Sequence, residues 1–337
     1  MQSFLLKLLR HEHLTVAESR AAMETIMDGR ASPAVCAAYL TALTMKGPTS
    51  DEITGAALVM REKVTRIDCA GRTVVDTCGT GGDCSGTFNI STAAALVAAG
   101  AGVAVAKHGN RSSSSRSGSS DVLEALGVRI DAPPEVVRRE VCEAGIGFLF
   151  APILHGAMRH AAPIRQELGI RTIFNLLGPL TNPAGARRQV MGVYEVGLVE
   201  LLGQVLQNLG TEHALVVHGT DGLDEITLSG PTRVAEVTPA AVRLYELVPE
   251  SFGLSRHDMT DFRVDSPAAS AALITSILRG ERGPARDVVV LNAAAAIYVA
   301  GLSPTLAAAI APAEQSIDSG AAAKALARLV EISHSAA

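Results

Sequence analysis

From Thr73 onward, short runs of β-branched residues alternate with alanine-rich runs, and this alternation constrains the fold more than any other feature of the sequence. The runs TVVDT and GVAVAKH have the composition of buried strands, and STAAALVAAGAG between them has that of a helix. Strands that alternate with helices form βαβ units and hence a mainly parallel sheet. We therefore expect an α/β domain over residues 71–337, with a central, mainly parallel sheet flanked by helices.

Later segments continue the alternation. Further strands are predicted at RRQVMGVY, HALVVHG, DEITL and RVAEV, and further helices at PILHGAMRHAAPIRQELG and VELLGQVLQNLG. The helix after the first strand is expected to begin at Ser91 or Thr92, and the helix SSDVLEALG at Ser119 or Ser120. The tail from about residue 266 is expected to be mostly helical.

The first 70 residues have a different pattern and are predicted to form a small helical domain of about four helices. Thr15 and Glu18 have the spacing of a capping box, and Ser32 precedes a proline at the first helical position. A third helix is expected to open at Ser50. The segment 163–183 interrupts the strand–helix alternation with Gly-Pro and Asn-Pro turns, so it is expected to pack away from the sheet.

Composition excludes several classes of protein. The 337 residues are 48% hydrophobic but only 3% aromatic, which suits aliphatic helices packed on a sheet. A net charge of -5 argues against a protein that binds nucleic acid or membranes through bulk charge. No apolar run reaches the length of a membrane span, so a cytoplasmic location is expected. The five cysteines are scattered and form no C-x-x-C pair, so neither a zinc site nor a disulfide framework is predicted.

A glycine-rich loop follows the first predicted strand. The stretch Val74–Thr92 contains Gly79, Gly81, Gly82 and Gly86 but no lysine or arginine. Such a loop lets backbone N–H groups approach a phosphate. It lacks the Gly-Lys-Ser/Thr of a Walker loop and the third glycine of a dinucleotide fingerprint, so neither of these sites is predicted.

The cations missing from this loop follow the next strand. The last two residues of GVAVAKH begin the stretch Lys107-His108-Gly109-Asn110-Arg111. A run of serines follows from Ser112. Neighbouring parallel strands end at the same edge of a sheet, where ligands bind. The two loops are therefore expected to form one phosphate site, although a serine run alone is also typical of a flexible loop.

Acidic and basic residues elsewhere add two candidate groups. Asp224 and Glu225 follow the predicted strand HALVVHG, and carboxylates beside a phosphate site suggest Mg²⁺. The alternative is an ordinary acidic turn, and within a strand the two side chains would point to opposite faces. Four arginines could each bind an acidic substrate, and their spacing does not choose among them: Arg165, Arg171, Arg187 and Arg188.

Together these motifs closely resemble the bacterial anthranilate phosphoribosyltransferase family, which belongs to the wider nucleoside phosphorylase/phosphoribosyltransferase-like group. The resemblance extends over nearly the whole chain and rests on GTGGD (79–83), NIST (89–92), KHGNR (107–111), SSRSGSSDVLEALG (114–127), RQELGIRTIFNLLGPLTNP (165–183) and the Asp224–Glu225 turn. It implies a small helical domain joined by 163–183, a larger α/β domain, and a homodimer formed through the helical parts. Ser113 and Ser120 depart from the family pattern, which often has Val and Ala there.

The resemblance also implies an activity, which is transfer of the phosphoribosyl group of PRPP to the amine of anthranilate in tryptophan biosynthesis. The implied catalytic residues are Lys107, His108 and Arg165. The implied PRPP contacts are Gly79, Gly82, Asp83, Thr87, Asn89, Ile90, Ser91, Thr92, Lys107, His108, Gly109, Asn110, Arg111, Ser112, Ser113, Ser114, Ser115 and Ser119. The implied anthranilate contacts are Gly79, Asn110 and Arg165, and the implied ligands of two Mg²⁺ ions per monomer are Ser91, Asp224 and Glu225.

Two other functions stay open on the sequence alone. Pyrimidine nucleoside phosphorylases share the implied architecture, but they would need no acidic Mg²⁺ pair. A non-catalytic relative could bind nucleic acid through Lys107, Arg111 and Arg116, although the acidic balance of the chain argues against this. The expected partners are therefore small molecules, with neither nucleic acid nor membrane among them.

Overall fold

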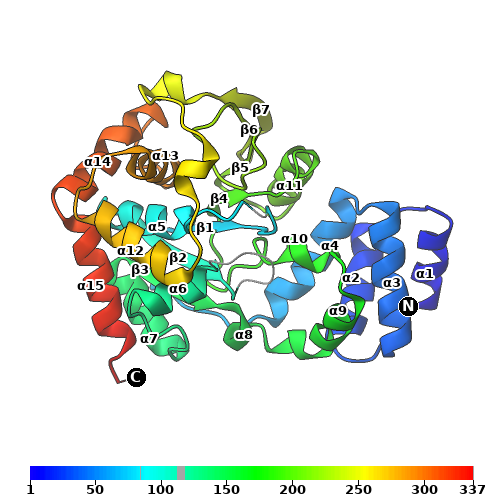
Figure 1. Cartoon of the computed structure of the whole chain (residues 1–337). Coiled ribbons are helices and arrows are strands. Elements are labelled where there is room, and N and C mark those ends of the chain that lie inside the picture. Colours follow the sequence, from blue (N-terminus) through cyan, green and yellow to red (C-terminus); the bar gives the residue numbers. More distant parts are fainter. Residues whose placement is uncertain (84, 112–117, 337) are drawn as a thin grey trace.

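The fold is that of a computed structural model, which describes residues 1–83, 85–111 and 118–336. Its N-terminal part is a helical unit, coloured blue in Figure 1, formed by α1 (Gln2–Leu9), α2 (Val16–Met27), α3 (Pro33–Lys46) and α4 (Ser50–Lys63). The predicted capping box of Thr15 and Glu18 opens α2, and Ser32 caps α3. Thr49 and Glu52 form a second capping box at α4, so the local signals place all three helix starts.

The rest of the described chain is built on a seven-stranded sheet. Its strands are β1 (Val74–Gly79), β2 (Ala104–Gly109), β3 (Ile146–Phe150), β4 (Arg188–Gly192), β5 (His213–Gly219), β6 (Thr232–Val237) and β7 (Val242–Leu247). They lie in the order β3-β2-β1-β4-β5-β6-β7. The first five in this order are parallel, whereas β6 and β7 are antiparallel. The mainly parallel sheet is confirmed, and β7 is a strand that the sequence reasoning missed.

The strand order places a topological switch at the centre of the sheet. The chain runs outward from β1 through β2 to β3, and then crosses back to place β4 on the other side of β1. In sheets of this kind, ligands bind where the order reverses, outside the carboxyl ends of the strands. The glycine-rich loop after β1 lies at this position.

Helices cover both faces of the sheet. The main ones after β1 are α5 (Ile90–Gly100), α6 (Ser119–Ala125), α7 (Pro134–Arg139), α11 (Gly197–Asn208), α12 (Pro267–Leu278), α13 (Pro284–Val299), α14 (Ile310–Asp318) and α15 (Ala321–Ser333). Alternate strand residues face opposite layers: Leu215 and Val217 pack with α5 and α13, whereas Ala214 and Val216 pack with α11. The second core continues from α11 into α2, α3 and α4, so the helical unit and the sheet share buried contacts.

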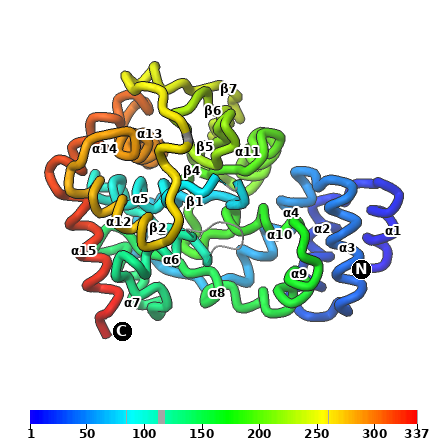
Figure 2. The backbone as a smooth tube through the Cα atoms, in the orientation of Figure 1, coloured from blue at the N-terminus to red at the C-terminus, as the bar shows by residue number. Residues whose placement is uncertain are grey.

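A broken helical segment connects β3 to the helical unit. One long helix was expected over PILHGAMRHAAPIRQELG, but the chain forms α8 (Ala151–Leu154), a 3-10 turn (Gly156–His160) and α9 (Ala162–Leu168) instead. Pro163 lies in the first turn of α9, where its missing N–H costs nothing, but it could not continue a helix from before it. α10 (Phe174–Leu177) follows, and Phe174, Leu177 and Leu180 pack in the core that contains α4. Figure 2 shows α9 and α10 beside α3 and α4.

Two further expectations were wrong. DEITL forms no strand, because Asp224–Leu228 lie in a loop before β6. α5 begins at Ile90 rather than at Ser91 or Thr92, because the Asn89 side chain caps it by accepting a hydrogen bond from the Thr92 N–H at 3.0 Å.

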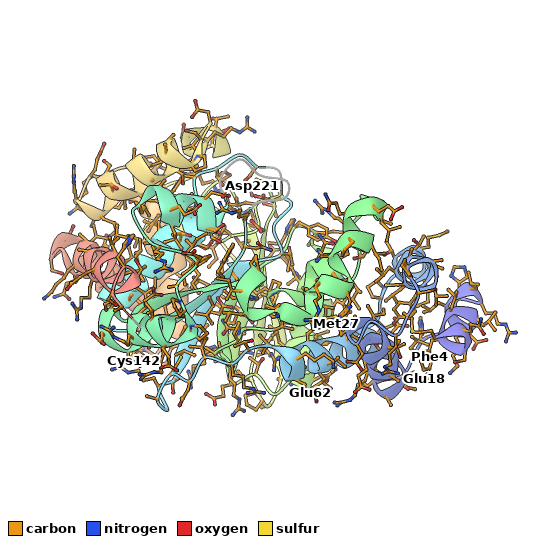
Figure 3. The ribbon with its side chains drawn as sticks, turned by 90° about the horizontal axis from the view of Figure 1, so that it is seen from below. Phe4, Glu18, Met27, Glu62, Cys142 and Asp221 are labelled. Carbon is orange, nitrogen blue, oxygen red and sulfur yellow. The ribbon has the colours of Figure 1, made fainter. Side chains whose placement is uncertain are left out.

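The molecule is elongated, with the helical unit at one end. In the view of Figure 3, Phe4 of α1 and Cys142 of the α/β part lie toward opposite ends. No helix in the described part of the chain is long and apolar enough to cross a membrane.

Candidate active site

A cavity of about 1090 Å³ lies between the carboxyl ends of the central strands and the broken segment after β3. It brings together most of the residues that the sequence singled out. The predicted site residues that line it are Gly79, Gly82, Asp83, Thr87, Asn89, Ile90, Ser91, Lys107, His108, Gly109, Asn110, Arg111, Ser119, Arg165, Asp224 and Glu225. Ser112, Ser113, Ser114 and Ser115 lie outside the described residues.

Thr92 is the described site candidate that does not line the cavity. Its side chain is fully buried, and its hydroxyl has no hydrogen-bond partner within the described chain. Its backbone N–H is the group that Asn89 caps. Thr92 therefore supports the start of α5 and does not face the ligand space.

The glycine-rich loop is held against the sheet and against an acidic side chain. The Thr80 N–H donates to the carbonyl of Gly192 at 2.9 Å, and the Gly81 N–H donates to Oδ2 of Asp224 at 3.1 Å. A Cβ atom at Gly79 would lie 2.6 Å from the same Oδ2, so only glycine allows this approach. Gly81 and Gly82 have φ values of 63° and 85°, which favour glycine.

Lys107 supplies the positive charge that the loop lacks. It lies on β2 with only 2% of its surface exposed, and its Nζ donates to the Thr77 carbonyl and, at 3.2 Å, to the Ser91 hydroxyl. Burial lowers the pKa of Lys107, and the neighbouring Asp76 carboxyl opposes this effect. The ammonium group is thus fixed between β1 and the start of α5, with the cavity in front of it.

Asp76 is a buried carboxyl beneath the cavity that the sequence reasoning did not select. Its Oδ1 accepts from the His108 N–H at 3.0 Å, and its Oδ2 accepts from Nδ2 of Asn182 at 2.7 Å. Burial raises the pKa of Asp76 to about 6, although these hydrogen bonds favour the ionised carboxyl and oppose the rise. Gln189 makes a parallel connection by donating to the Pro179 carbonyl at 2.7 Å. The segment 178–182 is therefore fixed to β1, β2 and β4.

Two histidines face each other in the cavity wall. Nδ1 of His108 lies 3.1 Å from the Gly178 carbonyl, and Nε2 of His108 lies 3.0 Å from Nε2 of His155. Burial lowers the pKa of His108 to about 3 and that of His155 to about 4, so both rings are neutral near pH 7. A carbonyl only accepts, so Nδ1 of His108 carries the proton and its bare Nε2 accepts from His155.

Asp224 and Glu225 both line the cavity because they lie in a loop and not in a strand. Burial, followed by repulsion from Asp83, raises the pKa of Asp224 to about 7. Burial, followed by repulsion from Asp224, raises the pKa of Glu225 to about 8, and the charge of Lys107, followed by a hydrogen bond with Ser91, opposes this rise. A cation bound between these two carboxyls would stabilise their ionised forms and lower both pKa values.

These donors suit a metal ion that is completed by its substrate. No three His, Cys, Asp or Glu side chains among the described residues form a ready metal cage. Mg²⁺ is commonly bound by one or two carboxylates together with substrate phosphates and water. The pair Asp224 and Glu225 fits this arrangement.

The structure separates the four candidate arginines. Arg165 and Arg171 line the cavity, whereas Arg187 and Arg188 pair with Glu212 beside the start of β4. Burial lowers the pKa of Arg165, and its guanidinium carbon lies 5.2 Å from the centre of the Phe174 ring. Arg165 is thus a partly desolvated cation beside an aromatic ring, a setting suited to an aromatic acid.

Arg111 lines the cavity but is already paired. Its guanidinium lies 2.9 Å from Asp121 and 2.7 Å from Glu124, both on α6. These hydrogen bonds raise the pKa of Arg111 above its usual range. A phosphate could recruit Arg111 only by competing with the two carboxylates.

The cavity therefore has two chemically different sides. On the sheet side lie backbone N–H groups, Lys107 and the acidic pair, which suit a polyanion with a divalent cation. On the segment side lie Arg165, the neutral histidines and Phe174, which suit a small aromatic acid.

Comparisons with known proteins agree with this arrangement. The sequence model of the glycosyl transferase family, a/b domain, matches residues 71–323, and that of the family's helical bundle domain matches residues 2–64. The anthranilate phosphoribosyltransferase of Symbiobacterium thermophilum is 55% identical over 334 residues, which cover 99% of this chain and 98% of that protein. The enzyme of the same name from Rubrobacter xylanophilus is 56% identical over 323 residues, which cover 96% of this chain and 94% of that protein.

Solved structures give the same result. Anthranilate phosphoribosyltransferase from Thermus thermophilus superposes with a TM-score of 0.93 at 45% identity, covering 98% of this chain and 99% of the other. The enzyme from Saccharomyces cerevisiae in complex with PRPP and Mg superposes with a TM-score of 0.89 at 28% identity, covering 98% of this chain and 97% of the other. The chain therefore belongs to the anthranilate phosphoribosyltransferase family of glycosyl transferases.

Proposed function

We propose that this protein transfers the phosphoribosyl group of PRPP to the amine of anthranilate, forming N-(5-phosphoribosyl)anthranilate and pyrophosphate. The observation that carries the proposal is a single cavity with a polyanion side and an aromatic-acid side. Structures of the yeast relative with PRPP and Mg, and with 4-fluoroanthranilate, support it.

PRPP would bind on the sheet side. The loop Gly79–Asp83, the capped start of α5 and the end of β2 supply backbone N–H groups, hydroxyls and Lys107. Asp83 would help to order this loop or to bind the donor, since it lies beside Asp224. Arg111 would join when a phosphate displaces its partners on α6.

Asp224, Glu225 and Ser91 would hold Mg²⁺ together with the donor. The two carboxyls have different neighbours: Asp224 contacts Gly81 and Asp83, whereas Glu225 contacts Ser91 and is influenced by Lys107. This difference supports two ion positions per monomer. When bound, Mg²⁺ offsets the negative charge that grows on the departing pyrophosphate.

Anthranilate would bind on the segment side, with its carboxylate at Arg165 and its ring near Phe174 and the histidines. Gly79 and Asn110 also line the cavity, and they would contact anthranilate where the amine meets the ribose. Arg165 is suited to a forked contact with the carboxylate, because desolvation strengthens a charge-assisted hydrogen bond.

The reaction breaks the bond from ribose C1 to pyrophosphate and forms a bond from C1 to the amine nitrogen, which then loses a proton. Lys107 and the loop N–H groups would stabilise charge on the leaving group. An aromatic amine is largely unprotonated at neutral pH, so correct positioning supplies much of the rate, an effect that reaches about 7–11 kcal/mol in well-oriented systems. His108 would act as part of the wall, because its Nε2 already accepts from His155.

We also propose that two copies associate through the helical unit. Leu6 and Leu9 of α1 and Met45 of α3 are large apolar side chains that are 54%, 62% and 79% exposed in the single chain. Burying them against a second copy would remove apolar surface from water. Light scattering on the purified protein measures its mass, and a monomer at micromolar concentration would contradict this.

The test of the function is the fluorescence of anthranilate with PRPP, measured with and without Mg²⁺. Consumption that depends on both PRPP and Mg²⁺ is expected. Thymidine with phosphate tests the nucleoside phosphorylase alternative, and a mobility-shift titration tests nucleic-acid binding. Turnover of thymidine without turnover of anthranilate would overturn the proposal.

A further inference from the structure

The two halves of the glycine-rich loop have different supports. The first half is held from the sheet, because Thr80 donates to the Gly192 carbonyl and its hydroxyl accepts from the Tyr194 N–H at 3.2 Å. The second half, at Gly82, faces the opposite wall of the cavity. There the side chain of Arg171 donates from Nη2 to the Gly82 carbonyl.

Arg171 lies directly against Gly82. A Cβ atom at Gly82 would be 2.6 Å from Nη2 and 3.0 Å from the guanidinium carbon, so any larger residue would displace the arginine. The guanidinium carbon also lies 4.0 Å from the centre of the Tyr194 ring, close enough for a cation–π contact. Tyr194 thus supports both halves of the loop, the first through its backbone and the second through Arg171.

The backbone of Arg171 belongs to the other side of the cavity. It follows α9, which carries Arg165, and its carbonyl accepts from the Thr44 hydroxyl of α3 at 3.5 Å. The next residue, Thr172, donates its N–H to Asn175 at 3.0 Å, which fixes the turn into α10. One side chain therefore connects the segment that lines the acceptor side to the loop that lines the donor side.

Holding the Gly82 carbonyl also sets the direction of the next N–H. In a trans peptide the C=O and N–H groups point in opposite directions. With the Gly82 oxygen turned toward Arg171, the Asp83 N–H is turned away from it.

We propose that Arg171 is a positioning residue for the donor loop, acting through the Gly82 carbonyl and seated on Tyr194. This positioning role rests on the proposed function, because the loop is taken as the PRPP site. Its role differs from that of Arg165, since its guanidinium is committed to the protein and not to a substrate carboxylate. The side chain couples the position of the acceptor segment to the shape of the donor loop.

Steady-state kinetics with each substrate varied in turn tests the assignment. Arg171→Ala should raise the KM for PRPP by about tenfold or more, as expected for loss of a charged hydrogen bond, with the KM for anthranilate near that of wild type. Arg165→Ala should show the reverse pattern. Arg256→Ala removes an exposed arginine that pairs with Glu250 outside the cavity, and it should change neither constant.

A double-mutant cycle tests whether Arg171 acts through its contact with Tyr194. Tyr194→Leu should raise the same KM by a smaller factor, and Arg171→Ala with Tyr194→Leu should be no worse than Arg171→Ala alone. Guanidinium ions at non-denaturing concentration should partly restore the KM for PRPP of the Arg171→Ala variant. If Arg171→Ala does not fold, Tyr194→Leu and Arg171→Lys carry the same comparison.

The outcomes are distinguishable from failure of the function itself. A wild-type protein without anthranilate turnover would refute the proposed function. An active wild type whose Arg171→Ala variant keeps its KM for PRPP would refute the positioning role alone. Additive effects in the cycle would mean that Arg171 acts independently of Tyr194, and would overturn the proposal that Arg171 is seated on Tyr194.

Discussion

His108 and His155 face each other with their Nε2 atoms 3.0 Å apart, and their pKa values are lowered to about 3 and about 4. A free histidine titrates near neutral pH, so a histidine in a cavity wall is a candidate general base by residue type alone. Burial and the contact with the Gly178 carbonyl change that role. The ring keeps one fixed proton, and its lone pair is occupied by a neighbour.

His108→Gln is therefore expected to keep the shape of the kcat–pH profile between about pH 5 and 8, because neither histidine titrates in that range. The KM for anthranilate should rise, since the ring forms part of the acceptor wall. The measurement is kcat and KM for both substrates across this range. His257→Gln, which removes a half-exposed histidine beside Asp261, is the control. If the fall of kcat at low pH disappeared in His108→Gln but not in His257→Gln, His108 would be assigned as a general base.

The sequence predicted which residues line the cavity where each of them belongs to a local motif near a strand end. Gly79 ends β1, Lys107 lies on β2 and Asp224 follows β5, and parallel strands end at one edge of the sheet, so their meeting in one cavity could be expected. Asp76 and Asn182 were missed because they are 106 residues apart, and nothing local marks their contact. Asp76 and Asn182 come together only because the segment 163–183 packs onto the sheet.

At the scale of helices and strands, local capping signals were the most reliable. The capping box at Thr15 and the serine before Pro33 predicted two helix starts because these motifs act within one turn. DEITL failed because its alternation of polar and apolar residues is typical of a strand, yet β5 pairs directly with β6 and leaves no place for it. Asn292 of α13 instead accepts the Ile226 N–H at 3.0 Å, which holds this stretch as a loop.

The helical unit contains a buried ion pair whose removal should be costly. The side chains of Lys46 and Glu52 are 2% and 0% exposed, and Nζ lies 2.9 Å from Oε2. Lys46→Met leaves the carboxylate without its charged partner, so a loss of about 3–5 kcal/mol in the free energy of unfolding is expected. Urea unfolding followed by circular dichroism measures this loss.

Lys63→Met is the matched comparison, because Lys63 also ends a helix and pairs with a carboxylate. Its side chain is 29% exposed, and that of its partner Asp28 is 37% exposed. Exposed ion pairs contribute about 1 kcal/mol or less to stability, so the free energy of unfolding of this variant should be close to that of wild type. Equal losses of unfolding free energy in the two variants would show that burial does not increase the contribution of the Lys46–Glu52 pair to stability.

At the scale of the whole molecule, the catalytic cavity depends on how the segment after β3 is fastened to the sheet. Three contacts connect residues 178–182 to strands β2, β4 and β1: His108 with the Gly178 carbonyl, Gln189 with the Pro179 carbonyl, and Asp76 with Asn182. The sequence showed that 163–183 leaves the alternation, but which polar groups fasten it could not be predicted, because each contact pairs residues from different elements. The same segment packs into the core of the helical unit.

Asn182→Ala is expected to destabilise the protein more at pH 8 than at pH 5. The pKa of Asp76 is about 6 in the folded state against an ordinary value of 3.8, so stability already falls as pH rises between these values. Asn182 lowers this pKa by donating to Oδ2, and its loss should raise the pKa further. At pH 5 the carboxyl is mostly protonated with or without Asn182. At pH 8 it is ionised, so a tenfold weaker acid in the variant would cost about 1.4 kcal/mol of additional stability.

Urea unfolding of wild type and variant at the two pH values gives the difference directly. Asn208→Ala is the control, because Asn208 also joins two elements, donating to the Thr54 hydroxyl at 3.3 Å, but touches no carboxylate. Its cost should be the same at both pH values. If the cost of Asn182→Ala were also independent of pH, Asn182 would fasten the segment only through its bonds to the Ala106 carbonyl and the Ala184 N–H, and not by supporting a buried charge at Asp76.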